Sequence, residues 1–169
     1  RRAREAGDAR RYVEAMHIIA QAAGVSGMIA GQAADIALEG KGRGEQALHY
    51  IHARKTAAMI RASVLSGAAL MGAGEADMRA LGRYGDCVGV LFQIVDDILD
   101  AVGDAQVLGK TPGKDAQAGK ATYPGLLGMD ESRRLQQLYL EGAIAALSGF
   151  DQRATPLREL ARFMVQRRS

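Results

Sequence analysis

Apolar residues recur every three or four positions through three long stretches of this chain, at about residues 10–36, 45–71 and 75–101. This spacing places the apolar side chains on one face of an α-helix. Shorter periodic stretches follow at about 131–147 and 156–166, and the 169 residues include only 3 prolines. No strand pattern is visible. The sequence therefore predicts an all-α helical bundle that forms a single domain over residues 1–169.

Glycine-bearing segments separate the predicted helices. Gly24 and Gly27 interrupt the first stretch, which we expect to be one helix that is kinked or joined from two. A polar loop at 39–44 follows the first stretch, and glycines at 72 and 74 end the second. The segment 103–119 is longer than a usual connection, so we expect it to be functional.

Composition excludes several classes of function. The net charge is +3, but the basic residues are scattered and show no stripe interleaved with aromatics, so we expect no nucleic-acid partner. Cys87 is alone and is interpreted as a buried apolar residue. No uninterrupted apolar stretch reaches the length of about 20 residues that spans a bilayer, so we expect no membrane anchor and a cytoplasmic location. The chain opens on Arg1, which suggests a fragment of a longer protein.

The end of the third predicted helix carries three carboxylates. Asp96 and Asp100 lie one turn apart, Asp97 lies beside them, and Gln93 precedes them by one turn. Like charges at this spacing destabilise a helix, and Mg²⁺ bound by one or two carboxylates would relieve the repulsion. The alternative is an ordinary solvated helix end. Acidic residues are unfavourable at a helix C-terminus, which favours a functional reason.

Two further groups of polar residues could serve such a site. His52, Lys55 and Thr56 share one face near the start of the second long helix, although an exposed lysine beside a half-buried histidine would give the same pattern. The long loop brings lysines close behind the aspartates, at 110, 114 and 120, with an acidic residue at 115. It is either a solvated segment or a clamp for a diphosphate group.

Together these residues resemble the polyprenyl synthetases, the all-α trans-isoprenyl diphosphate synthases, over nearly the whole chain after about residue 10. Five ordered blocks carry the resemblance. They are Gly31-Gln32-Ala33-Ala34-Asp35-Ile36, His52-x-x-Lys55-Thr56, Gly89-x-x-Phe92-Gln93-x-x-Asp96-Asp97-Ile98-Leu99-Asp100, Leu108-Gly109-Lys110-Thr111 and Gly119-Lys120-Ala121-Thr122-Tyr123-Pro124. The resemblance implies an isoprenoid-synthase-type helical bundle, of which this chain is the C-terminal part without the N-terminal helices.

The resemblance also implies a reaction. An allylic diphosphate ionises with the help of Mg²⁺, isopentenyl diphosphate attacks the cation head to tail, and a proton is lost. The product would be a short-chain trans-prenyl diphosphate such as farnesyl or geranylgeranyl diphosphate. The sequence does not specify the chain length or the allylic primer. The family further implies a homodimer, with helices such as the second long helix packing across the two-fold axis.

Matching positions assign expected roles to individual residues. Asp96 and Asp100 would hold magnesium, with Asp97 adjoining them. Lys55 and Lys110 would bind the allylic diphosphate. The remaining roles are implied in the same way. Lys120, also a diphosphate ligand, would order the closing loop together with Asp115. Thr56 and Gln93 would lie near the allylic carbon. Gln32 and Asp35 would face the cavity, with Asp35 near metal-bound water or Lys55, and His52 would either face the site or pack.

One departure from the family is large. The first aspartate-rich motif, which should lie upstream of Gln32, is absent from these residues, so we expect little or no synthase activity from this chain alone. Three other interpretations stay open: a catalytically silent or truncated homologue that serves as a helical partner subunit, a terpene cyclase on the same fold, and a plain helical bundle with an acidic patch. The retained lysines and aspartates argue against the silent subunit, and D-D-I-L-D with trailing lysines differs from the usual second motif of cyclases.

Overall fold

The computed structural model describes residues 6–38, 44–107 and 122–167, and helices dominate all three ranges. The helices predicted from periodicity are present. In chain order the elements are α1 (Ala6–Ala23), α2 (Met28–Ala37), α3 (Glu45–His52), the π-helical segment η1 (Ala53–Ala57), α4 (Ala58–Leu70), α5 (Glu75–Val107), α7 (Tyr123–Leu127), α8 (Met129–Ala146), the 3₁₀ turn η2 (Gln152–Ala154) and α9 (Thr155–Gln166).

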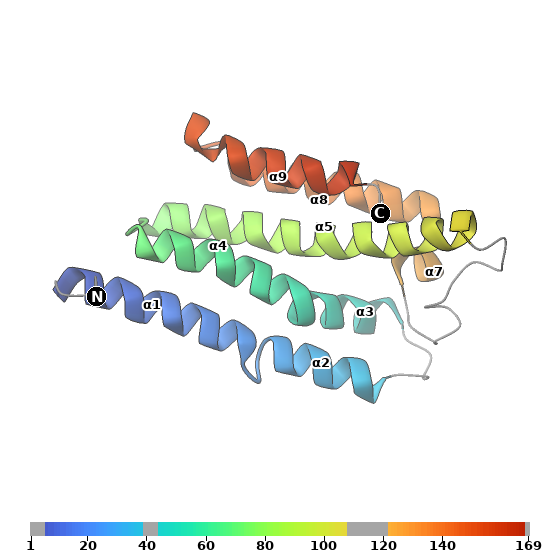
Figure 1. The fold of residues 1–169 in the computed structure, drawn as a ribbon, viewed down its shortest axis with the longest axis horizontal. Helices are drawn as coiled ribbons and strands as arrows, with labels where there is room; N and C mark the ends of the chain where they lie inside the picture. Colours follow the sequence, from blue (N-terminus) through green and yellow to red (C-terminus); the bar gives the residue numbers. More distant parts are fainter. Residues whose placement is uncertain (1–5, 39–43, 108–121, 168–169) are drawn as a thin grey trace.

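The helices lie side by side along the long axis of the molecule (Figure 1). The α1–α2 pair lies against α3–α4, and α4 packs on α5. Helix α5 packs in turn on α8, and α9 lies beside α8. The short helix α7 lies near the C-terminal end of α5 (Figure 1). The 33-residue helix α5 is therefore the element that both halves of the described bundle share.

Two apolar clusters hold α5 in place. Tyr84 and Val88, in its first half, pack with residues of α8 and α9 around Ala143 and Ala161. Near its other end Ile94 and Ile98 pack with buried residues that include Leu48 of α3 and Tyr123 of α7. The second cluster lies directly beneath the acidic residues of α5, so the candidate site emerges from a packed core.

The second predicted helix contains an irregularity that periodicity did not reveal. Residues Ala53–Ala57 form a single π-helical turn between α3 and α4. Such turns contain an extra residue relative to an α-helix and are frequent at functional sites. Gly31 of α2 and Gly89 of α5 contact this turn so closely that a β-carbon on either would overlap the backbone of Lys55 or Ala57 respectively. The glycines thus allow α2 and α5 to pack tightly on η1.

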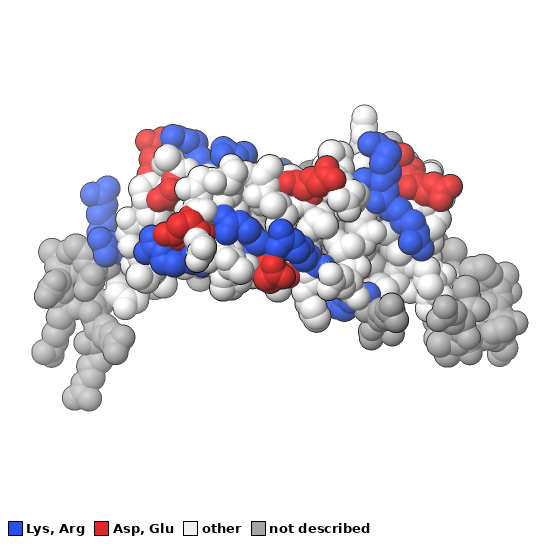
Figure 2. All heavy atoms as spheres, turned by 90° about the horizontal axis from the view of Figure 1, so that it is seen from above, with Lys and Arg blue, Asp and Glu red and all other residues white. Residues whose placement is uncertain are grey.

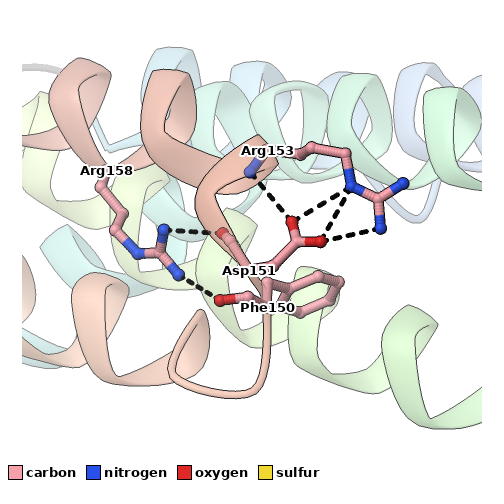
Figure 3. A network of polar contacts seen from close by, with 4 residues as sticks. All are labelled: Phe150, Asp151, Arg153 and Arg158. Carbon is pink, nitrogen blue, oxygen red and sulfur yellow. Dashed lines mark hydrogen bonds and ion pairs between the residues drawn. The ribbon is translucent and has the colours of Figure 1, made fainter.

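A polar network closes the connection between α8 and α9 (Figure 3). The Arg158 guanidinium donates to the carbonyl oxygens of Leu147 at 2.8 Å, Phe150 at 2.7 Å and Asp151 at 3.1 Å. The Asp151 carboxylate accepts from the Arg153 amide at 2.9 Å and also pairs with its guanidinium. Arg158 therefore ties together carbonyl groups of the connection, two of which, those of Leu147 and Asp151, also accept from backbone N–H groups.

The structure corrects the expected boundaries at three places. The first stretch is two helices, separated by a turn at 24–27, which decides between the kinked and joined alternatives. Helix α5 continues to Val107, so the loop expected to begin at Gly103 starts later. Tyr123–Leu127, expected to close the loop, form the helix α7, because Thr122 caps its start through Gly125 N–H and Pro124 suits a first turn.

Helices α1 and α2 expose an unusual amount of apolar surface. Exposed side chains include Val13, Met16 and Ile19 of α1 and Ile29 and Ile36 of α2. By length and composition the 29-residue stretch Ala9–Ala37 passes as a candidate membrane span, although polar residues such as His17 and Gln21 interrupt its apolar run. Core helices of globular proteins pass the same test, and the break at 24–27 divides this stretch, so the finding alone assigns no membrane segment.

Candidate functional site

The three aspartates at the end of α5 have different surroundings. Asp96 is partly exposed and Asp100 is exposed, whereas only 7% of Asp97 is accessible. Asp97 follows the buried Ile94 by three positions and therefore shares its face of the helix. The outer pair of carboxylates, one turn apart, is thus available to a ligand, while the middle carboxylate points into the core.

Asp97 is held by hydrogen bonds in this buried position. Its Oδ2 accepts from the backbone N–H of Tyr123 at 2.9 Å, and the side chain of Gln93 also hydrogen-bonds to it. Burial raises the pKa of Asp97 to about 7, and the two hydrogen bonds oppose this shift, while the negative charges of Asp96 and Asp100 add to it. Gln93, expected near an allylic carbon, thus lies against Asp97.

A residue from the far end of the chain reaches the acidic patch. The guanidinium Nη2 of Arg167 lies 2.8 Å from Asp96 Oδ1. The same guanidinium lies over the ring of Phe92, with 5.5 Å from its Cζ to the ring centre. Sequence reasoning missed Arg167 because the two paired residues are far apart in the chain and no local pattern links them.

The lysine predicted to bind diphosphate is paired with an acid of α2. Lys55 Nζ lies 2.7 Å from Asp35 Oδ2, with 39% and 17% of the respective side chains exposed. This contact is one of the two positions that the sequence suggested for Asp35. Thr56 is partly exposed and Gln32 is exposed. The π-helical turn carries Lys55 and Thr56, so its extra residue sets the direction in which both point.

His52 packs beneath this surface. It is 9% exposed, and its ring lies against that of Tyr123, with the centroids 5.4 Å apart. His49 Nδ1 lies 3.5 Å from the Tyr123 hydroxyl. Of the two alternatives for His52, the structure shows the packed one. Tyr123 is the second residue that sequence reasoning missed: it appeared within a motif, but no role was assigned to it.

The remaining candidates lie outside the described residues. Lys110, Asp115 and Lys120 fall within 108–121, so the structure does not place them. Within the described ranges no three His, Cys, Asp or Glu side chains form a group that could hold a metal ion. Two carboxylate groups, those of Asp96 and Asp100, are nevertheless a donor set that suits Mg²⁺, which takes one or two carboxylates together with water and substrate phosphates.

Charges of both signs are mixed on one face of the molecule. On the face shown in Figure 2, Lys and Arg side chains are interleaved with Asp and Glu. Several arginines are paired with nearby acids, including Arg134 with Glu131 at 2.6 Å and Arg162 with Glu159.

An all-helical bundle whose central helix carries a pair of carboxylates in its second half, beside a lysine-bearing turn, is the arrangement of the isoprenoid synthase class. The model of the polyprenyl synthetase family matches residues 2–153, and the chain belongs to this family. Similar proteins include a dimethylallyltranstransferase of Fischerella ambigua, 44% identical over 88% of this chain and 43% of the relative. A geranylgeranyl diphosphate synthase of Cyanophora paradoxa is 42% identical over 88% of this chain and 50% of the relative.

Solved structures agree with this assignment. An FPP/GFPP synthase from Zymomonas mobilis superposes with a TM-score of 0.81 at 31% identity, covering 92% of this chain and 51% of that one. A geranyltransferase from Helicobacter pylori, complexed with magnesium and isoprenyl diphosphate, gives a TM-score of 0.73 at 28% identity, covering 93% of this chain and 52% of that one. The chain spans about half the length of these relatives. The expected fold class is confirmed.

Proposed function

We propose that this chain forms part of an isoprenyl diphosphate synthase that condenses isopentenyl diphosphate with an allylic diphosphate, head to tail, to give a short-chain trans-prenyl diphosphate. The observation that carries the proposal is the outward pair Asp96 and Asp100 on a helix anchored by a packed core, with Lys55 on the neighbouring η1. The family to which the chain belongs supports the same reaction.

The residues have separate tasks in this proposal. Asp96 and Asp100 would hold Mg²⁺, which when bound supplies the charge neutralisation that makes diphosphate a good leaving group. Lys55 would bind the allylic diphosphate through its ammonium group, together with Lys110 and Lys120. Asp35, 2.7 Å from Lys55 Nζ, keeps this ammonium group in place while no substrate is present.

The small residues of the bundle also suit the reaction. Gly31 of α2 and Gly89 of α5 let these two helices approach η1 closely. A rigid and closely packed wall would shelter an allylic cation from water, and the oxygen dipoles of Thr56 and Gln93 would favour the cation without trapping it.

A binding experiment on the chain as it exists tests this proposal. Isothermal titration calorimetry with geranyl diphosphate, with and without Mg²⁺, should show binding that requires the metal and is lost in Asp96→Asn. Asp86→Asn is the matched control, because Asp86 lies on the same helix and pairs with Arg61 at 3.0 Å. Geranyl diphosphate binding that requires neither Mg²⁺ nor the Asp96 carboxylate would contradict the proposal.

An activity assay separates the synthase from its alternatives. The chain is incubated with isopentenyl diphosphate, each allylic primer in turn and Mg²⁺, and products are identified by mass. We expect little or no turnover from these 169 residues alone, and binding without turnover agrees with a truncated synthase. A cyclic hydrocarbon product would instead show a terpene cyclase.

We also propose a homodimer in the cytoplasm. The exposed apolar face of α1 and α2 supports association, because isolated apolar faces of this kind are normally covered. The helix at 45–71, which was first expected to pack across the two-fold axis, exposes fewer large apolar side chains, namely Tyr50, Leu70 and Met71. Light scattering after size-exclusion chromatography measures the mass, and a monomer at all concentrations would contradict the dimer.

A further inference from the structure

The start of α7 is fastened to the acidic end of α5. A helix leaves its first backbone N–H groups without intrahelical acceptors, and Tyr123 is the first residue of α7. Its N–H donates to Asp97 Oδ2 at 2.9 Å, in a contact where both residues are buried, at 4% and 7% exposure. Asp97 therefore acts as an N-cap supplied by another helix.

Tyr123 also contacts α3. Its ring packs against His52, with centroids 5.4 Å apart, and it belongs to the same core cluster as Leu48. His52 precedes Lys55 by three residues, and Asp97 directly follows Asp96. One buried residue thus connects α3, which leads directly into the turn η1 that carries Lys55, with α5, which carries the proposed metal ligands.

We propose that Asp97 is a positioning residue rather than a third metal ligand, and that it acts with Tyr123 to fix the end of α5 relative to α3. This inference rests on the proposed function, because it concerns how that site is held. It gives different roles to three aspartates that look equivalent in the sequence: the outer two face the ligand, and the middle one binds the protein itself.

Substitution of Asp97 separates the two roles. In Asp97→Asn the amide oxygen can still accept from Tyr123 N–H, and Gln93 can reverse its amide to match. Asp97→Ala removes the acceptor and leaves a buried N–H without a hydrogen bond. A metal ligand would tolerate neither change, whereas a positioning residue would tolerate the first.

The experiment uses the full chain, Mn²⁺ with inorganic pyrophosphate as the probe, and electron paramagnetic resonance to count bound metal. We expect Asp97→Asn to keep the Mn²⁺ affinity within about two-fold, and Asp97→Ala to weaken it about ten-fold, as loss of a residue that orients a ligand typically does. Asp96→Asn should lose binding, and Asp86→Asn should match the wild type.

A spectroscopic readout follows the anchor independently of the metal. In ¹⁵N-labelled protein without Mn²⁺, the amide proton of Tyr123 should resonate at similar positions in wild type and Asp97→Asn and move upfield in Asp97→Ala. If Asp97→Ala fails to fold, loss of Mn²⁺ binding in the folded Asp97→Asn protein is decisive against the inference.

The outcomes distinguish the inference from the function on which it rests. An Asp97→Asn protein that loses Mn²⁺ as Asp96→Asn does would show that Asp97 is a ligand. A folded Asp97→Ala protein with unchanged affinity would show that the anchor does not act on the site. Absence of Mn²⁺ binding in the wild type would overturn the proposed function itself, and the positioning role with it.

Discussion

Arg167 and Asp96 form an ion pair of 2.8 Å that brings the end of the C-terminal helix onto the carboxylate pair of α5. The guanidinium is placed where a cation bound by Asp96 would compete with it. The contact is partly exposed, at 36% and 43% of the two side chains, so solvent screens much of its energy. The pair is therefore weak enough for a divalent ion to displace.

Arg167→Gln tests this competition. We expect Mg²⁺ or Mn²⁺ to bind about two- to five-fold more tightly, which corresponds to the worth of an exposed ion pair, and the free energy of unfolding to change by less than about 0.5 kcal/mol. Calorimetric titration measures the affinity. Arg162→Gln is the control, because Arg162 lies on the same helix and pairs with Glu159. Weaker metal binding in Arg167→Gln would show that the arginine supports the site instead.

The Lys55–Asp35 pair predicts a measurable coupling. Lys55→Met and Asp35→Asn should each destabilise the chain, because each removes the 2.7 Å contact between the two side chains. The double substitution should lower the free energy of unfolding by about 0.5 to 1 kcal/mol less than the sum of the two single effects. This coupling is small because Lys55 is 39% exposed. Urea unfolding of the four proteins measures it. Strict additivity would mean that the pair contributes nothing to stability.

Arg158→Met should remove the carbonyl contacts at the end of α8 while keeping the apolar stem. We expect a loss of about 2 kcal/mol in the free energy of unfolding, since three carbonyl groups lose a charged donor. Arg153→Met is the control, because that side chain is 92% exposed and its loss should change the free energy of unfolding much less. If Arg158→Met and Arg153→Met lowered the free energy of unfolding equally, the carbonyl contacts of Arg158 would not be what stabilises this connection.

Tyr84 predicts a loss of stability at high pH. Its hydroxyl donates to Leu157 O at 2.7 Å, and burial raises its pKa to about 12 from an ordinary 10.0. The folded state then keeps a proton that the unfolded state loses, so stability falls between about pH 10 and 12, by up to about 3 kcal/mol. Urea midpoints across this range measure the slope. Tyr84→Phe should be less stable at pH 8 and should lose less with rising pH, and an unchanged slope would contradict the prediction.

The presence of the long helices, though not all of their ends, was predictable from the sequence because an apolar period of 3.6 residues persists over many turns. The burial of Asp97 was also accessible in principle, since it continues the spacing of Val90 and Ile94. The charges and the motif drew attention to the three aspartates as a group, so the position of Asp97 on the apolar face of the helix was overlooked.

Other features had no local signal. The contacts of Arg167 with Asp96 and of Tyr123 with Asp97 and His52 join positions that only the folded chain brings together. The short helix α7 was missed because five residues are too few for a periodic pattern, although Thr122 and Pro124 are typical of a helix start. Neither a cap nor a proline by itself distinguishes a helix from a turn.

The π-helical turn Ala53–Ala57 restricts how this part of the chain can change in length. Deleting one residue there would let α3 and α4 merge into one regular helix, but it would turn everything on one side by about 100° relative to the other. Lys55 would then leave Asp35, or Leu48 would leave the core. Because this irregular turn keeps two helical faces in phase, substitutions in it are tolerable where single insertions and deletions are not.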